Sequence, residues 1–211
     1  MKISYAICTH NESESLFNLT EKINQNKDTQ DEIVFLDDHS TNKVTKDFLK
    51  NQENVYYNHL NKNYANHKNI LKKHCSGDYI FQIDADEYPT LQLFVSLKKI
   101  INKNPKVDLF RVPRQNYVNG ILKEHIVKWR WSIDEKRRIN YPDYQTRIFK
   151  NTNYIYWTRP VHEYITGFKV ATNLPKDKNL DLIHKKEIQN QVKNNLIYQK
   201  NYNSDGSIKK T

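Results

Sequence analysis

The sequence predicts an α/β fold in which a mainly parallel central sheet is layered between helices as an α/β/α sandwich. Over residues 1–90, short apolar stretches rich in β-branched and aromatic residues alternate with segments whose apolar residues have helical spacing. Such an alternation is typical of parallel strands joined by helices that cover the faces of the sheet. Three of the strand-like stretches also end in polar clusters, which would meet at one edge of the sheet.

In the first half of the chain, strands are expected at residues 3–8, 31–36, 55–57 and 79–83. The helices between them are marked by inward-facing residues three and four positions apart: Leu16, Leu19 and Ile23 in the first, Val44 and Phe48 in the second, and Ala65, Ile70 and Leu71 in the third. Asn11 and Glu14 fit a capping box before the first helix. Either Ser40 or Asn42 is expected to cap the second.

In the second half, a helix is expected after Pro89, with Leu93, Leu97, Ile100 and Ile101 at helical spacing. Strands follow at residues 107–113 and 180–184, and a C-terminal helix starts at Glu187. Residues 1–211 are expected to form a single domain. Its parts would be a first half at 1–88, a second half at 89–184, and a C-terminal helix and tail at 185–211.

The acidic group that ends the strand at residues 79–83 suggests a site. In an extended chain, Asp84 and Asp86 point to the same side, roughly 6–7 Å apart. Two carboxylates placed in this way suit a hard divalent cation such as Mg²⁺ or Mn²⁺. The alternative is a solvated turn that leads into a helix capped by Thr90.

Composition limits the partners. A net charge of +10 and a pI of about 9.4 favour anionic partners, but no basic run of five residues occurs, so nucleic acid is not expected. No apolar run of 18 residues is present, so no transmembrane segment is expected. Cys8 and Cys75 are isolated, which favours a reducing compartment, and we expect a cytoplasmic, soluble protein.

Four motifs in order resemble family 2 glycosyltransferases, which have the GT-A fold. They are Cys8-Thr9-His10-Asn11-Glu12, Leu36-Asp37-Asp38-His39-Ser40-Thr41, the helix start from Asn61 to Asn69, and Gly77-Asp78-Tyr79-Ile80 followed by Asp84-Ala85-Asp86 (the D-x-D motif). The chain departs from the family at four positions. His39 and Asn63 replace glycines but tolerate positive φ, His10 replaces a tyrosine that stacks on the base, and Lys68 keeps the charge of an arginine without its bidentate fork.

A second resemblance covers residues 142–167, where Asp143 to Lys150, Trp157 and Val161-His162-Glu163 follow one another. This order is similar to the lipopolysaccharide-core glucosyltransferases of bacteria and to glycosyltransferases of large DNA viruses. It suggests a viral or bacterial enzyme of glycan biosynthesis.

The family resemblance implies an inverting, metal-dependent transfer of a hexose from a nucleotide sugar, with UDP as the expected nucleotide, to a hydroxyl of a glycan or glycolipid acceptor. Residues 1–88 would then be the nucleotide-sugar-binding half and residues 89–184 the acceptor-side half. The cofactor would be Mn²⁺ or Mg²⁺. The donor would be bound by Thr9, His10, Glu12, Asp38, Lys68, Asp84 and Ala85, and the metal by Asp86 with Asp84 and His184. Glu163 would be the general base with His162 beside it, and Asp143 and Glu87 are the alternatives.

Three other functions stay open at this stage: a metal-dependent phosphodiesterase or nuclease, a non-catalytic nucleotide-sugar-binding module, and a nucleic-acid-binding protein. One cluster is also ambiguous. Tyr117, Trp129, Arg130 and Trp131 form either an acceptor platform or a set of half-buried core aromatics.

Overall fold

The computed structural model describes residues 1–176 and 178–209. The first half alternates as expected: β1 (Ile3–Thr9), α1 (Glu14–Asn26), β2 (Glu32–Asp37), α2 (Lys43–Leu49), β3 (Asn54–Tyr57), α3 (Tyr64–Lys73) and β4 (Tyr79–Asp84). The second half contains β5 (Glu87–Pro89), α4 (Leu91–Lys103), β6 (Leu109–Asn119), α5 (Lys123–Trp129), β7 (Ile139–Lys150), β8 (Tyr156–Thr158), β9 (Tyr164–Thr166), β10 (Ala171–Asn173), β11 (Leu182–Glu187) and α6 (Ile188–Asn201). The tail expected at the C-terminus includes residues 210 and 211, which lie outside the described part.

The main sheet has the strand order β3-β2-β1-β4-β7-β6-β11-β5, and β10 pairs with β6. Strands β1, β2, β3 and β4 are parallel. Along the chain, a crossover helix joins each of them to the next. Strand β7 is antiparallel to both of its neighbours, β4 and β6, whereas β6 and β11 are parallel. The expected mainly parallel α/β sheet is therefore confirmed, and the mixed part begins where β7 enters.

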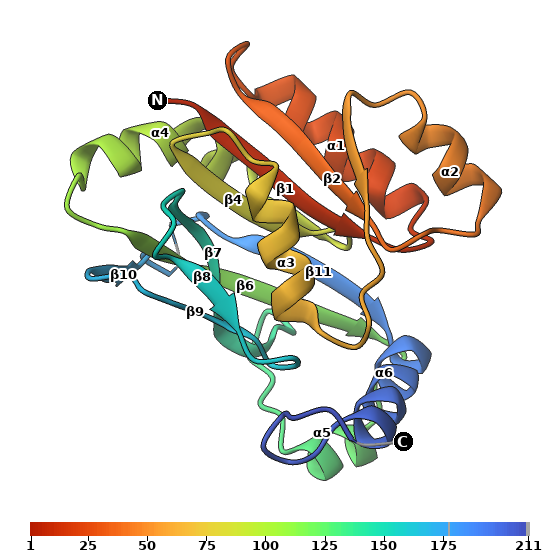
Figure 1. Cartoon of the computed structure of the whole chain (residues 1–211). Coiled ribbons are helices and arrows are strands. Elements are labelled where there is room, and N and C mark those ends of the chain that lie inside the picture. Colours follow the sequence, from red (N-terminus) through yellow and green to blue (C-terminus); the bar gives the residue numbers. More distant parts are fainter. Residues whose placement is uncertain (177, 210–211) are drawn as a thin grey trace.

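Side chains alternate between the two faces of the sheet and fill two cores. On one face, Tyr5 and Ile7 of β1 pack with residues of α1 and α4; on the other, Ala6 packs with residues of α3, β8 and β9. Figure 1 shows α3 and the β8–β9 pair on one face and α1 and α4 on the other. The second layer therefore contains a small two-stranded sheet as well as a helix.

Parallel β1, β2 and β4 end at the same edge, because their register pairs Thr9 with Asp37 and Cys8 with Asp84. Strand β6 runs in the same direction, being antiparallel to β7, and β11 follows it. Helix α6 begins directly after β11 and lies beyond this edge (Figure 1). The polar ends of the strands and the C-terminal helix therefore surround one space, as expected for an open α/β sheet.

The structure corrects the expected start of the first helix. Asn11 has a φ of 56°, and its side-chain oxygen accepts from the backbone N–H groups of Thr41 and Asn42. Asn11 is therefore not a helix cap but ties the β1 loop to the β2 loop. The helix begins at Glu14, after Ser13.

Local expectations at the other helices are partly confirmed. Asn42 caps α2 and Thr90 caps α4 through their side-chain oxygens. Val44, expected to face inward, is 53% exposed, since Asn42 starts α2 in an orientation that directs Val44 to solvent. Of the two family glycine positions, His39 has a φ of 48°, whereas Asn63 has a φ of −128° and caps α3.

Two strands differ in length from the expectation. Strand β6 continues to Asn119 and β11 to Glu187 because they pair with each other over six residue pairs, from Leu182 with Arg114 to Glu187 with Asn119. Such long-range pairing is not visible in a local apolar pattern. Within residues 1–176 and 178–209, no helix has both the length and the apolarity needed to cross a bilayer.

Candidate active site

A cavity of about 600 Å³ opens at the carboxyl edge of β1 and β4, and we call it the donor cavity. Every residue that the sequence singled out as a principal site residue lines it: Thr9, His10, Glu12, Asp38, Lys68, Asp84, Ala85, Asp86, His162, Glu163 and His184. The two alternative bases, Asp143 and Glu87, do not line this cavity. Residues from the whole length of the chain therefore meet in one place.

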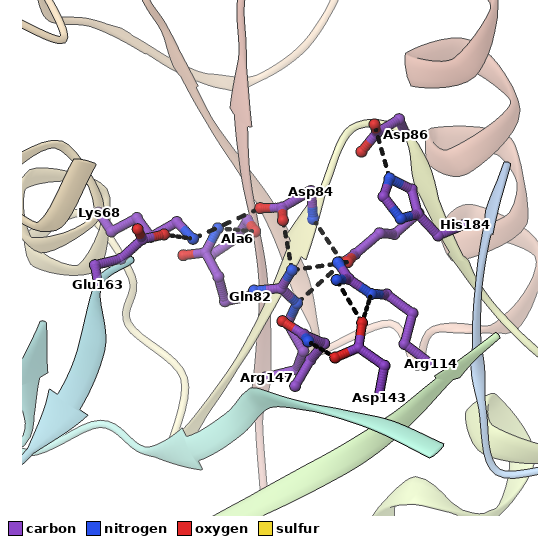
Figure 2. Close-up of polar contacts among 12 residues, drawn as sticks. Ala6, Lys68, Gln82, Asp84, Asp86, Arg114, Asp143, Arg147, Glu163 and His184 are labelled. Atoms are coloured by element: carbon purple, nitrogen blue, oxygen red, sulfur yellow. Dashed lines mark hydrogen bonds and ion pairs between the residues drawn. The ribbon is translucent and has the colours of Figure 1, made fainter. Parts of the chain in front are cut away.

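The expected extended geometry of the D-x-D motif is wrong. Strand β4 ends at Asp84, and residues 85 and 86 form a turn before β5. Strand β5 then pairs back against β11, with Glu87 opposite His184. The two carboxylates of the motif consequently face different partners: Asp86 lies beside His184, and Asp84 faces two cations (Figure 2).

Asp84 is held by the guanidinium of Arg147, which donates a short hydrogen bond, and by the ammonium of Lys68 at 3.7 Å. Burial, the largest influence, would raise the pKa of the Asp84 carboxyl, but Arg147 and Lys68 together hold it well below its usual range. Asp84 is therefore a permanent anion whose position is fixed by these two cations.

Glu87 is fully buried between two arginines. Arg147 donates to both of its carboxylate oxygens, at 2.9 and 2.7 Å, and Arg114 donates to one of them at 2.7 Å. The Glu87 carboxylate also accepts from the backbone N–H of Asp84 at 3.3 Å, across the turn. These contacts make Glu87 the anchor of the turn that presents Asp84 and Asp86.

The sequence interpretation assigned no role to Arg114 or Arg147. Arg147 lies within the motif that carried the second resemblance, and this was the one available signal. Arg114 lies in the middle of β6, where nothing in the local pattern distinguishes it. The pairing of β6 with β7 brings both arginines to Glu87 of β5, with which each forms an ion pair.

A chain of hydrogen bonds orients His184. Arg114 holds the Asp143 carboxylate, which accepts from Nδ2 of Asn116 at 2.8 Å. The amide oxygen of Asn116 therefore faces Nδ1 of His184 at 2.9 Å and accepts its proton. This leaves Nε2 of the buried His184 ring pointing at Asp86 Oδ2, 3.0 Å away.

The contact between Asp86 and His184 places a nitrogen and a carboxylate oxygen face to face. Because both atoms carry lone pairs, the contact is favourable only with a proton or a cation that both atoms can bind. Metal-binding histidines commonly donate their other N–H to an oxygen acceptor, as Nδ1 does here. Asp86 and His184 thus suit a divalent cation.

The expected third ligand is not brought into this pair, because Asp84 faces Arg147 and Lys68 instead. Among residues 1–176 and 178–209, no group of three or more His, Cys, Asp and Glu side chains is arranged to hold a metal ion. The donor set available in this arrangement is one carboxylate and one imidazole.

Lys68 is 6% exposed and lies between two anions. It donates to Glu163 at 2.7 Å and lies 3.7 Å from Asp84 (Figure 2). It also lies 4.6 Å from the ring centre of Trp157. Burial alone would lower the pKa of Lys68, but the charges of Asp84 and Glu163 raise it above its ordinary value. Lys68 is a fixed positive charge inside the cavity.

Polar groups also line the β1–β2 end of the cavity. Asp38 accepts from the backbone N–H of Leu60 at 2.9 Å, and its backbone carbonyl contacts Nδ1 of His10 at 2.8 Å. Thr9 Oγ1 and Trp157 Nε1 are buried without a hydrogen-bond partner among the described residues. Buried polar atoms in native proteins normally have partners, so these two cavity-lining groups suit a polar ligand.

The aromatic residues expected to form an acceptor platform or a core cluster lie outside the donor cavity. The rings of Trp129 and Trp131 are 4.7 Å apart, and His125 stacks on Trp129. Both tryptophans are half-buried around the short helix α5. Tyr117 and Trp131 line a smaller cavity of about 180 Å³ together with Asp143.

Comparison with known proteins decides the family. The model of glycosyl transferase family 2 matches residues 4–165. The chain belongs to this family. The family predicted from the four motifs is thereby confirmed, and the matched residues contain the D-x-D turn, Lys68 and Glu163.

Solved structures agree on the fold. S. aureus TarS residues 1–349 superpose with a TM-score of 0.61 at 16% identity, over 88% of this chain and 60% of that one. The same protein in complex with UDP-GlcNAc gives a TM-score of 0.60 at 18% identity, over 88% of this chain and 58% of that one. The chain therefore has the GT-A glycosyltransferase fold and spans about three fifths of the TarS fragments it matches.

Proposed function

We propose that this protein transfers a hexose from a nucleotide sugar to a hydroxyl group of a glycan acceptor, with inversion at the anomeric carbon. The observation that carries the proposal is the donor cavity, where residues of all four family motifs line one space with Glu163 and His184. The TarS complex with UDP-GlcNAc supports a UDP-sugar as the donor. The acceptor is proposed from the family's chemistry alone.

The nucleoside would lie at the β1–β2 end of the cavity. Asp38 and the unpartnered hydroxyl of Thr9 offer hydrogen bonds to the base and ribose, and His10 offers a ring to stack on the base. Lys68 would contact the diphosphate, because its buried ammonium lines the cavity 3.7 Å from Asp84. Glu12 and Ala85 also line the donor cavity.

Mn²⁺ or Mg²⁺ would be held by Asp86 and His184, and the donor set of one carboxylate and one neutral imidazole fits Mn²⁺ in particular. When bound, the cation supplies positive charge to the diphosphate leaving group. Asn116 and Asp143 fix the ring of His184, so that Nε2 points to Asp86. Asp84 would contribute through the negative charge that keeps Lys68 and Arg147 in place.

Glu163 is the proposed general base. Direct displacement needs one carboxylate that takes the proton of the acceptor hydroxyl, and Glu163 lines the donor cavity with its neighbour His162. Asp143 does not line the donor cavity, and Arg114 and Asn116 hold its pKa below its ordinary value against the opposing effect of burial. Glu87 is fully buried between two arginines.

Calorimetric titration with UDP, with and without Mn²⁺, tests the donor site on the wild type and on Asp86→Ala. We expect Mn²⁺-dependent binding that the variant loses. An absence of UDP binding to the wild type in both conditions would refute a UDP-sugar site. GDP and dTDP, and then cleavage of DNA or of a phosphodiester dye, would be measured next.

Glu163→Gln tests the base. We expect turnover of a UDP-sugar, followed as UDP release, to fall by at least about 10² while UDP affinity stays within about twofold. Asp143→Asn in parallel serves as the comparison. Unchanged turnover in Glu163→Gln with a large loss in Asp143→Asn would move the base to Asp143.

A further inference from the structure

A second and larger cavity, of about 1190 Å³, adjoins the donor cavity, and we call it the groove. It lies between the β1–α1 loop, the ends of β6 and β11, the loop before β7, and helix α6. The two cavities share His10, Glu12, Asp86, Lys186 and Asn194. A ligand in the groove therefore ends next to the proposed metal and donor.

The groove collects cations from three separate parts of the chain. Lys136 and Arg137 come from the loop before β7, Lys185 and Lys186 from β11, and Lys193 from α6. No run of basic residues marks them in the sequence. The long β6–β11 pairing and the position of α6 bring them together.

These five cations are unpaired in the described part of the chain: none of their side chains forms an ion pair or a hydrogen bond there. Three carboxylates also line the groove, and each has another partner. Glu12 accepts from Ser15, Asp86 faces His184, and Glu187 accepts from Asn119. With five cations against three carboxylates, the lining of the groove carries a net positive charge.

The remaining lining suits a chain of sugars. Ile133, Ile139 and Ile197 provide apolar surface, while Asn119 and Asn190 offer amide groups for hydroxyls. Tyr88 adds a half-buried ring close to Asp86. Apolar faces interrupted by amides match the alternation of ring faces and hydroxyls along an oligosaccharide.

We propose that the groove binds the acceptor, and that this acceptor is an anionic glycan carrying phosphate or carboxylate groups along its chain. The inference rests on the proposed transferase function and adds the chemical class of its second substrate. The cations would bind anionic groups away from the reacting hydroxyl, which would reach the donor cavity past Asp86 and Asn194. Exposed cations of this kind accelerate and orient binding of an oppositely charged ligand.

Fluorescence polarisation with short labelled dextran oligosaccharides tests the charge requirement, using one probe that is phosphorylated and one that is unmodified, in the presence of UDP and Mn²⁺. We expect the full-length wild-type chain to bind the phosphorylated probe at least about tenfold more tightly. Equal affinities for the two probes would overturn the proposal.

The triple variant Lys136→Ala/Arg137→Ala/Lys193→Ala removes groove cations that do not line the donor cavity. It should lose most of the difference between the two probes and keep the UDP affinity of the wild type. The matched control, Lys22→Ala/Lys46→Ala/Lys99→Ala, makes the same change in net charge on exposed faces of α1, α2 and α4. The control should keep the difference.

Three outcomes contradict the proposal: the difference survives in the groove variant, it falls equally in the control, or a single-stranded DNA of equal charge binds the groove more tightly than the phosphorylated glycan. The UDP titration of the same samples keeps the two hypotheses apart. Wild type that binds UDP without preferring the anionic probe would refute only the groove assignment. Wild type that prefers the anionic probe but binds no UDP would refute only the donor assignment.

Discussion

The donor cavity and the groove adjoin each other but differ in whether their charged side chains form ion pairs. In the donor cavity, Asp84 and Glu163 are paired with Lys68 or Arg147, and Arg147 is also paired with the buried Glu87 outside its lining. In the groove, the lysines and arginine have no such partner among the described residues. The difference indicates two tasks: a fixed arrangement of charges for chemistry on one side, and open positive charge for capturing a ligand on the other.

The paired charges of the donor cavity should be important for folding. Arg147→Met leaves Asp84 and the buried Glu87 without their main partner, and we expect a loss of about 3–5 kcal/mol in the free energy of unfolding. Urea denaturation measures it. Arg111→Met is the matched control, since Arg111 lies on β6 with one long hydrogen bond to Asn173 and no ion pair in the described residues. A loss below about 1 kcal/mol in Arg147→Met would show that the network does not stabilise the fold.

The oriented histidine should matter for metal affinity. Asn116→Leu removes the acceptor of the His184 Nδ1 proton, and we expect Mn²⁺ to bind about tenfold more weakly, as is usual when such a partner is lost. Mn²⁺ binding is measured directly by electron paramagnetic resonance, without substrate. Asn119→Leu on the same strand is the control and should leave Mn²⁺ affinity unchanged. Equal affinities in wild type and Asn116→Leu would remove Asn116 from the site.

The paired carboxylates should also affect the stability of the fold at acidic pH. Because Arg114 and Asn116 lower the pKa of Asp143 in the folded state, its contribution to stability is present above the unfolded pKa of about 3.9 and is lost as the pH falls below it. Asp143→Asn should therefore lose less stability than wild type as the pH falls below about 4. Denaturation curves across this range measure the slopes. Identical slopes would mean that Asp143 titrates alike in both states.

The smallest effect is expected in the groove. Lys185→Gln removes an exposed, unpaired cation, and the free energy of unfolding should change by less than about 0.5 kcal/mol. The same urea experiment measures it. A larger loss would mean that Lys185 has a structural role, and the contrast between the two cavities would weaken.

The sequence predicted the α/β alternation, and which residues would meet at one cavity, better than it predicted their geometry. Motif residues at the ends of β1, β2 and β4 were identifiable because parallel strands bring their carboxyl ends to one edge. The turn that separates Asp84 from Asp86 was not, because it depends on the pairing of β5 with β11. Arg114 and Arg147 could not be identified from the sequence for the same reason: their partner Glu87 lies about thirty or sixty positions away in the chain.

The errors at Asn11 and Val44 have a related origin. Asn11 has the right residue type for a cap, but its oxygen binds the neighbouring loop instead of its own helix. Val44 follows a helical spacing, yet the start of α2 set by Asn42 directs it to solvent. Local patterns therefore identified the elements, and contacts between loops decided the details. The groove escaped the sequence interpretation for the same reason.

Helix α6 forms a wall of both cavities, with Asn194 lining each of them, and Ile188 is its one fully buried residue. Because α6 lines both cavities, the proposed donor and the proposed acceptor would bind against the same helix. If the acceptor increases the affinity of the protein for UDP by some factor, UDP must increase its affinity for the acceptor by the same factor. Two titrations in opposite order would measure that reciprocity, and shortening the side chain of Ile188 would change both affinities together.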